Sequence, residues 1–261
     1  MKFILYILIA LSAYAAKAEP DYKSTETKLI IKKMIQAHGG YEKWSKAPSI
    51  RFDNVMHNNY HQKEQFAWWI AHEVIDQKMR QVYQDWPMDN ATIGFDGKAV
   101  WQKNWQKGNP PEFMVHFFYY FVNLPWITQD NNVVLSAVDK FKWPGQEKEF
   151  YQIKMTFKGE ASVGKSLKDY FVLYIDPDTY LLRGYQYATG YEPFLELMGL
   201  KGKYEVFGPL WRTITKYTNV DGLIFPAAFR TMPEADERIV GNHVILNIEI
   251  DKPFDYSKAK P

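Results

Sequence analysis

The run that most resembles a chemical motif is Gly159 to Ser166, which reads GEASVGKS and matches the phosphate-binding pattern G-x-x-x-x-G-K-S. That loop binds phosphate only between a strand and the N-terminus of a helix, because backbone N–H groups and the helix dipole hold the anion. Residues 167–179 read LKDYFVLYIDPDT, which is typical of a second strand and a turn. The pattern therefore indicates a hairpin loop, and we expect no nucleotide or other cofactor.

Metal binding is the next chemistry to consider, because His57, His61 and His72 lie close in sequence and Glu73 follows the last of them. On a strand, four residues span about 13 Å. This is too far for His57 and His61 to share an ion whose ligand distances are about 2.1 Å. We interpret these residues as polar strand histidines and expect no metal site.

No sequence signature nominates a catalytic residue. The chain has neither a G-x-S-x-G nor an H-E-x-x-H motif, and it contains no cysteine that could act as a nucleophile. Its 30 carboxylates are scattered over predicted strands and turns, so no acid–base pair stands out. We expect a protein that binds rather than one that catalyses.

Aromatic residues are the compositional outlier, at 17% of the chain. Such side chains bury large areas in wide β-sheet cores or line apolar cavities, and both interpretations remain open here. His38 ends a predicted helix, where the helix dipole favours a proton on the ring, and either packing or ligand contact fits it. The candidate ligand-binding residues are His38, Trp68, Trp101, Phe117, Phe118, Phe121 and Trp126.

The N-terminus predicts export. Residues 1–18, MKFILYILIALSAYAAKA, combine an early lysine, an apolar stretch and an A-x-A cleavage site, which is typical of a secretory signal removed before Glu19. Its loss removes Lys2 and Lys17 and leaves 30 basic against 30 acidic residues, a balance that does not favour nucleic acid as a partner. Without cysteine there is no lipid-anchored N-terminus. We expect a non-lipidated periplasmic or secreted bacterial protein, a monomer with no transmembrane segment in residues 19–261.

The elements that must position the candidate residues begin with an amphipathic helix at 24–38, capped by Ser24 or Thr25 and ended by Gly39 and Gly40. After it the apolar period changes to two, and about ten to twelve strands follow with short connections. The dipeptides Asp96-Gly97 and Asp221-Gly222 supply the positive φ that tight hairpins need. The pattern predicts one domain with a single antiparallel sheet.

The exception is residues 109–126, NPPEFMVHFFYYFVNLPW, which are apolar on nearly every side. The apolar part, 113–127, is shorter than the roughly 20 residues that span a bilayer as a helix. Asn109 could cap a helix, the next two prolines fit its first turn, and Pro125 would stop it. A helix that is apolar all round must be covered all round, so we expect a strongly curved sheet wrapped about it.

Five stretches in order resemble one family of proteins. They are HGGYEKW (38–44), YFVNLPW (120–126), VLYIDPDTYLLRGYQY (172–187), VDGLIFP (220–226) and EIDKPF (249–254). Together they resemble an uncharacterised family of secreted Gram-negative proteins related to the LolA-like lipoprotein-carrier superfamily. The resemblance implies an antiparallel half-barrel, mainly β with a few helices packed in its concave face, and an apolar cavity between them that accepts acyl chains.

Three functions are compatible with these observations. The first is a binding or carrier protein for an apolar ligand, an acylated lipid or a lipoprotein, held between sheet and helices. The second is a secreted hydrolase acting on glycans or lipids with a carboxylate site in the same concavity, which predicts ionisable groups with perturbed pKa values at its mouth. The third is an envelope scaffold with a filled core, which offers a sheet edge to a protein partner.

Overall fold

The computed structural model describes residues 19–59, 67–107, 109–142, 147–159, 168–197, 210–233 and 239–261. The predicted signal, His61 and most of the GEASVGKS loop lie outside the described residues. The helices are α1 (Thr25–Ala37), α2 (Tyr41–Lys46), the 3-10 helix η1 (Pro87–Asp89), α4 (Pro111–Ile127) and α5 (Glu192–Leu197). None of the described helices is both long and apolar enough to cross a bilayer.

The strands fall into two series along the chain. The first series is β1 (Asp21–Tyr22), β2 (Ser49–Asn58), β3 (Trp68–Asp76), β4 (Val82–Trp86), β5 (Ala91–Phe95) and β6 (Val100–Lys103). The second is β7 (Val133–Leu135), β8 (Asp139–Lys142), β9 (Glu149–Phe157), β10 (Tyr170–Ile175), β11 (Leu182–Ala188), β12 (Leu210–Val220), β13 (Leu223–Pro233) and β14 (Gly241–Glu249).

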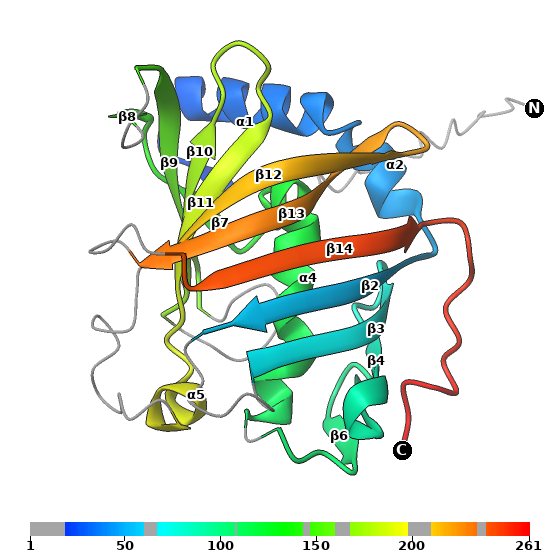
Figure 1. The fold of residues 1–261 in the computed structure, drawn as a ribbon. Helices are drawn as coiled ribbons and strands as arrows, with labels where there is room; N and C mark the ends of the chain where they lie inside the picture. Colours follow the sequence, from blue (N-terminus) through cyan, green and yellow to red (C-terminus); the bar gives the residue numbers. More distant parts are fainter. Residues whose placement is uncertain are drawn as a thin grey trace, which may run out of the picture.

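All the strands belong to one open, curved sheet in the order β1-β7-β9-β10-β11-β12-β13-β14-β2-β3-β4-β5-β6, with β8 on β9 (Figure 1). The pairs are antiparallel except for the short β1–β7 contact. The last strand, β14, pairs with β2 and so joins the two series. The predicted half-barrel, mainly β with a few helices, is confirmed.

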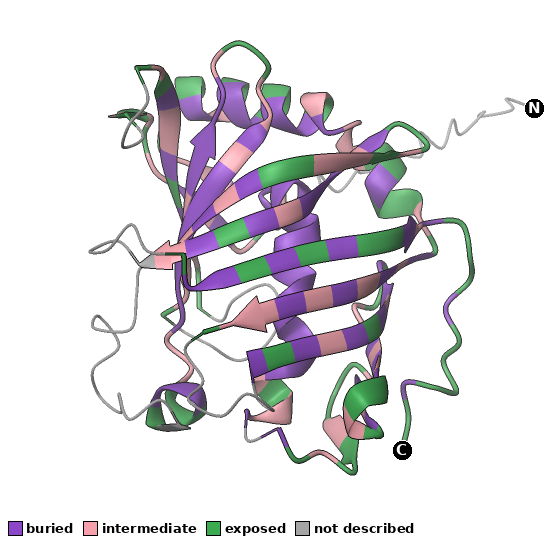
Figure 2. Cartoon of the chain, viewed as in Figure 1, coloured by how far each residue is buried: buried purple, intermediate pink, exposed green. Residues whose placement is uncertain are grey.

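Helix α4 connects the two ends of this sheet. It follows β6, which forms one edge, and precedes β7, which lies beside the other edge. The chain must therefore cross the hollow, and Figure 1 shows α4 running behind the middle strands. Every residue from Met114 to Ile127 is buried, and Figure 2 shows the helix purple along most of its length. The all-round apolar segment is thus covered on all sides, as its pattern predicts.

Alternating burial along the strands shows which side chains face α4. On β14, Gly241, His243 and Ile245 are buried, while Val244 and Leu246 between and after them are exposed. The same alternation gives the striped strands in Figure 2. Successive side chains of a strand point to opposite faces of its sheet, so the concave face is apolar and the convex face mixed.

The ends of α4 differ from the sequence-based expectation. Asn109 is not the cap: Pro110 holds that position and makes no side-chain hydrogen bond. Pro125 does not stop the helix, which continues to Ile127. A proline in the last turn costs one hydrogen bond, and the complete burial of Trp126 and Ile127 favours keeping that turn helical.

Helix α1 ends against the β12–β13 hairpin. Ser24 caps its start by accepting a hydrogen bond from the backbone N of Thr27 at 3.0 Å. At its other end, Gly39 has a φ of +96°. A Cβ on Gly39 would lie 2.2 Å from the carbonyl oxygen of Gly222 in the hairpin turn. Two sequence signals far apart in the chain, the Gly-Gly helix stop and the Asp-Gly turn, therefore meet at one backbone contact.

This contact yields a stability prediction. The substitution Gly39→Ala combines about 1 kcal/mol for a positive φ with roughly 1–3 kcal/mol for the clash with Gly222. Gly159→Ala is the matched control, because Gly159 has a φ of +81° and no neighbour within 4 Å of the new Cβ. Urea unfolding of both variants should give the larger loss for Gly39→Ala. Equal losses would contradict the close approach.

Candidate functional site

A file of aromatic rings in contact runs along α4 beneath the sheet. Phe194 of α5 packs on Phe113 with ring centroids 4.2 Å apart, Phe113 on Phe117 at 4.9 Å, and Phe117 on Phe121 at 4.5 Å. Spacing of four residues brings side chains of one helix face into contact, which explains the repeat. We call these four residues the aromatic file. It leads from α5 to the middle of the hollow.

Arg212 of β12 lies at the inner end of the aromatic file and is fully buried. Its guanidinium carbon is 4.0 Å from the ring centroid of Phe121 and 4.7 Å from that of Phe229. Nη1 donates to Oγ1 of Thr231 at 3.1 Å, and Nη2 lies 2.6 Å from Nδ1 of His243. A cation is therefore held among aromatic rings in the core.

The protonation of His243 follows from its partners. Arginine only donates, so Nδ1 of His243 accepts from Arg212 and the ring proton sits on Nε2. Nε2 then donates to Oδ1 of Asn54, whose Nδ2 donates to the carbonyl oxygen of Trp69 at 3.2 Å. Burial, with Arg212 adding to it, holds the pKa of His243 well below its usual value. The ring is neutral, and it fixes the direction of the guanidinium.

These residues come from one row across adjacent strands. Arg212 on β12 is opposite Tyr185 on β11 and opposite Thr231 on β13, and β14 and β2 add His243 and Asn54. We call these five residues the polar row. Sequence reasoning missed it, although alternation places Arg212 in phase with Leu210 and Ile214, and Asn54 in phase with Phe52. A polar residue on the apolar phase of a strand was the available signal.

No described residue balances the charge of Arg212. Among these residues it forms no ion pair, and its Nε has no hydrogen-bond partner. The buried hydroxyl of Tyr185, the cross-strand neighbour, interacts with the guanidinium and has no other described partner. Burial raises the pKa of Tyr185, so this group stays a neutral donor. Buried charges are normally paired because their desolvation costs several kcal/mol.

Four of the candidate aromatic residues lie on α4 inside the hollow. Phe117, Phe118 and Phe121 pack together, with Phe117 and Phe118 both edge-on to Trp69 of β3. Trp126 lies nearer the other end, where it stacks on Trp44 at 5.9 Å. The structure therefore brings three of the candidate residues together and leaves the fourth one apart, beside α2.

His38 is in the interior, next to Trp126, and is fully bonded. Its Nδ1 lies 2.6 Å from the carbonyl oxygen of Ile224, and its Nε2 accepts from the backbone N of Leu182 at 3.1 Å. An acceptor nitrogen has no proton, so the ring is neutral. Burial lowers the pKa of His38 to about 4. The expectation that the helix end favours a charged ring is wrong, because desolvation outweighs the dipole.

Trp68 and Trp101 point away from α4. Trp68 alternates with the inward Trp69 and packs against His57 at 4.5 Å. Trp101 covers Gly94 and donates from Nε1 to the carbonyl oxygen of Ala259. It therefore lies under the C-terminal tail on the convex face. The structure does not bring these two residues to the other candidates.

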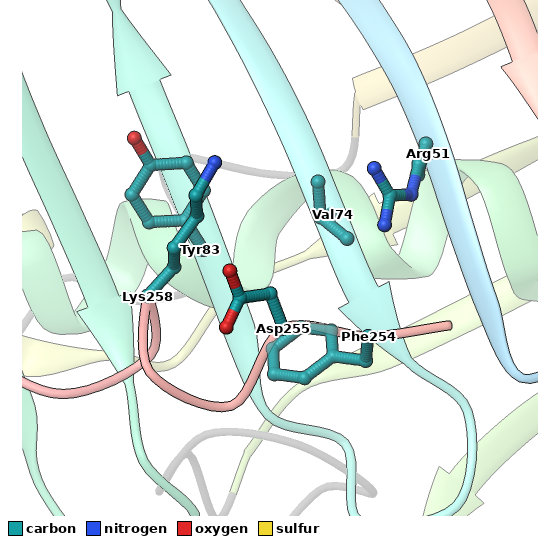
Figure 3. Close-up of a pocket in the computed structure, with 6 residues that line it drawn as sticks. All are labelled: Arg51, Val74, Tyr83, Phe254, Asp255 and Lys258. Atoms are coloured by element: carbon teal, nitrogen blue, oxygen red, sulfur yellow. The ribbon is translucent and has the colours of Figure 1, made fainter. Parts of the chain in front are cut away.

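The same tail closes a small cavity of about 50 Å³, shown in Figure 3. Tail residues Phe254, Asp255 and Lys258 lie over Arg51, Val74 and Tyr83 of the sheet. A depression of about 480 Å³ lies at the α1–α2 junction, lined by Tyr41, Lys43 and their neighbours. Neither lies in the hollow, where the rings of α4 and of the sheet are buried against one another.

A hydrolytic site would need more than the described interior offers. Glu73 of β3 is fully buried, and burial raises its pKa well above the usual value. Its Oε2 accepts from Nε2 of Gln84 at 2.9 Å, and Gln84 also bonds the carbonyl oxygen of Met114. Glycoside hydrolysis uses two carboxylates that work together, whereas the hydrogen-bond partner of Glu73 is an amide. No metal-binding cluster occurs among the described residues.

The buried histidines predict acid sensitivity. Burial lowers the pKa of His38 and of His116 to about 4, and it holds that of His243 well below its usual value. A histidine whose pKa is lowered by folding leaves stability at its full value above pH 6.5. As the pH falls below that value, the unfolded state binds a proton that the folded state does not, so the free energy of unfolding decreases. Each should reduce the free energy of unfolding by about 1.4 kcal/mol between pH 7.5 and 5.5. Urea unfolding at pH 7.5 and 5.5 measures this loss, which should be smaller in His116→Phe because that variant lacks one of the three histidines. A free energy of unfolding that is the same at both pH values would contradict the prediction.

Two arginines should respond oppositely to loss of their charge. Arg80 forms a two-pronged pair with Asp130 at 2.7 and 2.6 Å, whereas Arg212 has no carboxylate. Arg80→Met should lower stability by about 1–3 kcal/mol, because Asp130 is left unpaired. Arg212→Met should leave stability unchanged or raise it by about 1 kcal/mol, because relief from desolvation offsets two lost hydrogen bonds. Thermal melting of both variants tests this prediction. A larger loss of stability in Arg212→Met than in Arg80→Met would contradict the absence of an ion-pair partner for Arg212.

Several solved structures are similar to this chain, at low sequence identity. No family model and no curated protein matches it. Among solved structures it is similar to a DUF1329 family protein from Desulfovibrio piger (11% identity, TM-score 0.44, covering 90% of this chain and 97% of that one). It is also similar to a LolA superfamily protein from Nitrosomonas europaea (6% identity, TM-score 0.46, covering 90% of this chain and 97% of that one). A third similar structure is an outer membrane lipoprotein-sorting protein domain from Vibrio parahaemolyticus (8% identity, TM-score 0.45, covering 90% of this chain and 96% of that one).

The LolA superfamily, named for the Nitrosomonas europaea protein, is also the one that the sequence stretches resemble. Each TM-score lies below 0.5, so the description of the fold as a half-barrel rests on the strand order and open edges of this chain itself.

Proposed function

We propose that the protein is a periplasmic or secreted binding protein that carries an apolar, acylated ligand between the curved sheet and α4. The observation that supports this proposal is the aromatic file, which forms a continuous apolar path from α5 to the middle of the hollow. An ordinary core also has aromatic contacts. Here, however, they follow one face of a helix that crosses an open sheet and begins beside a separate short helix.

The binding mechanism is exchange of one apolar group for another. Each aromatic side chain buries roughly 150–250 Å². Each methylene of an acyl chain that leaves water contributes about 0.8 kcal/mol. An acyl chain that displaces the rings of Phe113 and Phe117 from the sheet therefore replaces their contacts with its own. The free energy of binding is the difference between the contacts that the acyl chain gains and those that the rings lose. Affinity therefore depends on how readily these rings move.

Entry is easiest at α5. This helix has six residues, and isolated helices shorter than about 12 residues are marginal in water. Its Phe194 stacks on Phe113, the first residue of the file on α4. The ring of Tyr191 also stacks on Phe113, at 6.2 Å, so displacement of these two rings would expose the end of the file. The other end of α4 is held by the Arg80–Asp130 pair and by Trp126, whose Nε1 donates to the carbonyl oxygen of Gly40.

The scaffold hypothesis also predicts a filled core, so occupancy must be tested directly. The chain purified without detergent should release acyl lipid detectable by mass spectrometry. After delipidation it should take up the neutral fluorescent probe N-phenyl-naphthylamine with a saturable rise in emission. A protein that carries no lipid and takes up no probe would overturn the proposal.

A pair of matched variants tests the exchange mechanism. Phe117 and Phe254 are similarly buried, at 8% and 7% exposure, but Phe254 belongs to the tail on the convex face. Each substitution to Ala should cost about 3–5 kcal/mol of stability. Only Phe117→Ala should bind the probe more tightly, by about tenfold, because the displaced ring no longer competes. A similar gain in both variants would indicate nonspecific cavity filling.

A further inference from the structure

Resting on the proposed function, we propose that the acyl ligand carries an anionic head, a carboxylate or a phosphate monoester, that Arg212 and Tyr185 bind at the inner end of the aromatic file. Lipids with uncharged heads would bind less tightly. The inference concerns the head of the ligand, whereas the carrier function concerns its chain.

The first step of the argument is the unbalanced charge. Arginine remains protonated in proteins, so burial cannot neutralise Arg212 as it does histidine or glutamate. The charged or polar groups that face it are the hydroxyls of Tyr185, Tyr187 and Thr231 and the neutral ring of His243. Burial raises the pKa of Glu73, the buried acid of β3, and so favours its uncharged form. None of the described groups that face Arg212 therefore carries a negative charge.

The second step is the supply of donors. The Nη atoms of Arg212 are directed to Thr231 and His243, while its Nε N–H has no acceptor. The hydroxyl of Tyr185, directly across the strand pair, contacts the guanidinium, and its own proton has no acceptor among the described residues. A buried donor with no acceptor is costly, and an anion can accept from both groups. A carboxylate or phosphate has two oxygens suited to this, and its hydrogen bonds to a guanidinium are among the strong ones.

The third step is pre-organisation. His243, tied to Asn54, and Thr231 hold the guanidinium in one orientation before any ligand arrives. A site with fixed donors does not lose further side-chain entropy on binding. Such a network is difficult to explain as a device for stability alone, because an apolar side chain of similar size would avoid the desolvation of a charge.

The fourth step is access. The ring of Phe121 covers the guanidinium in the structure, with 4.0 Å between the guanidinium carbon and the ring centroid. Phe121 is also the innermost member of the aromatic file. The displacement that admits an acyl chain along the file therefore uncovers the cation. Phe113 and Phe121 are eight residues apart, about 12 Å along a helix, so the head lies deep and the chain extends towards α5.

The test compares three ligands with the same sixteen-carbon chain. Hexadecanoate, hexadecyl phosphate and hexadecanol are titrated against delipidated protein loaded with N-phenyl-naphthylamine at pH 7.5. At least one anionic ligand should displace the probe at about tenfold lower concentration than the alcohol. A preference for only one of the two anions supports the proposal and identifies the head group. Equal displacement by all three overturns it while leaving the carrier function standing, and no displacement by any ligand overturns both.

Substitutions test whether Arg212 and Tyr185 cause the preference for an anionic head group. Arg212→Met should abolish the preference and leave hexadecanol binding in place, and Tyr185→Phe should reduce it several-fold. Arg51→Met is the control for net charge, because Arg51 lies on the convex face and donates to the carbonyl oxygen of Pro253. It should keep the full preference. Should Arg212→Met fail to fold, the wild-type comparison and Tyr185→Phe still decide; a preference unchanged in Tyr185→Phe and Arg212→Met overturns the proposal.

Discussion

The burial of α4 is the constraint on which the rest of the structure depends. Its sequence is apolar on every side, and the topology makes it the link between the two ends of the sheet. A helix of this kind is stable only when it is covered all round, which requires curvature of the sheet and a second layer on the other side. Trp44 of α2 contributes to that layer, donating from Nε1 to Oδ1 of Asn123 at 2.7 Å.

The interior combines two features that are opposed in an ordinary core. The aromatic file offers large apolar surfaces, whereas the polar row sets a permanent cation beneath them. Packing rings against a guanidinium recovers part of the desolvation cost through cation–π attraction. It does not supply a counter-charge. This combination suits an amphiphile better than a purely apolar guest, since an amphiphile satisfies both features at once.

Local sequence signals predicted the elements well where each depends on a few neighbouring residues. Ser24 caps α1 as its position implies, and the Asp221-Gly222 turn joins β12 to β13 with both residues at positive φ. The predictions that were wrong depend on burial. Pro125 lies within α4 because the residues after it are buried, and His38 is neutral because the β-strand backbone surrounds it.

The sequence by itself determined the helical and strand periods, the apolar crossover segment and the resemblance that implies a half-barrel. Only the tertiary structure decided which aromatic residues share the hollow, separating Trp68 and Trp101 from Phe117, Phe118 and Phe121. It also decided that Arg212, Tyr185 and His243, far apart in the chain, form one row. The reason is that strand alternation specifies a face of the sheet, whereas neighbours across strands depend on register and curvature.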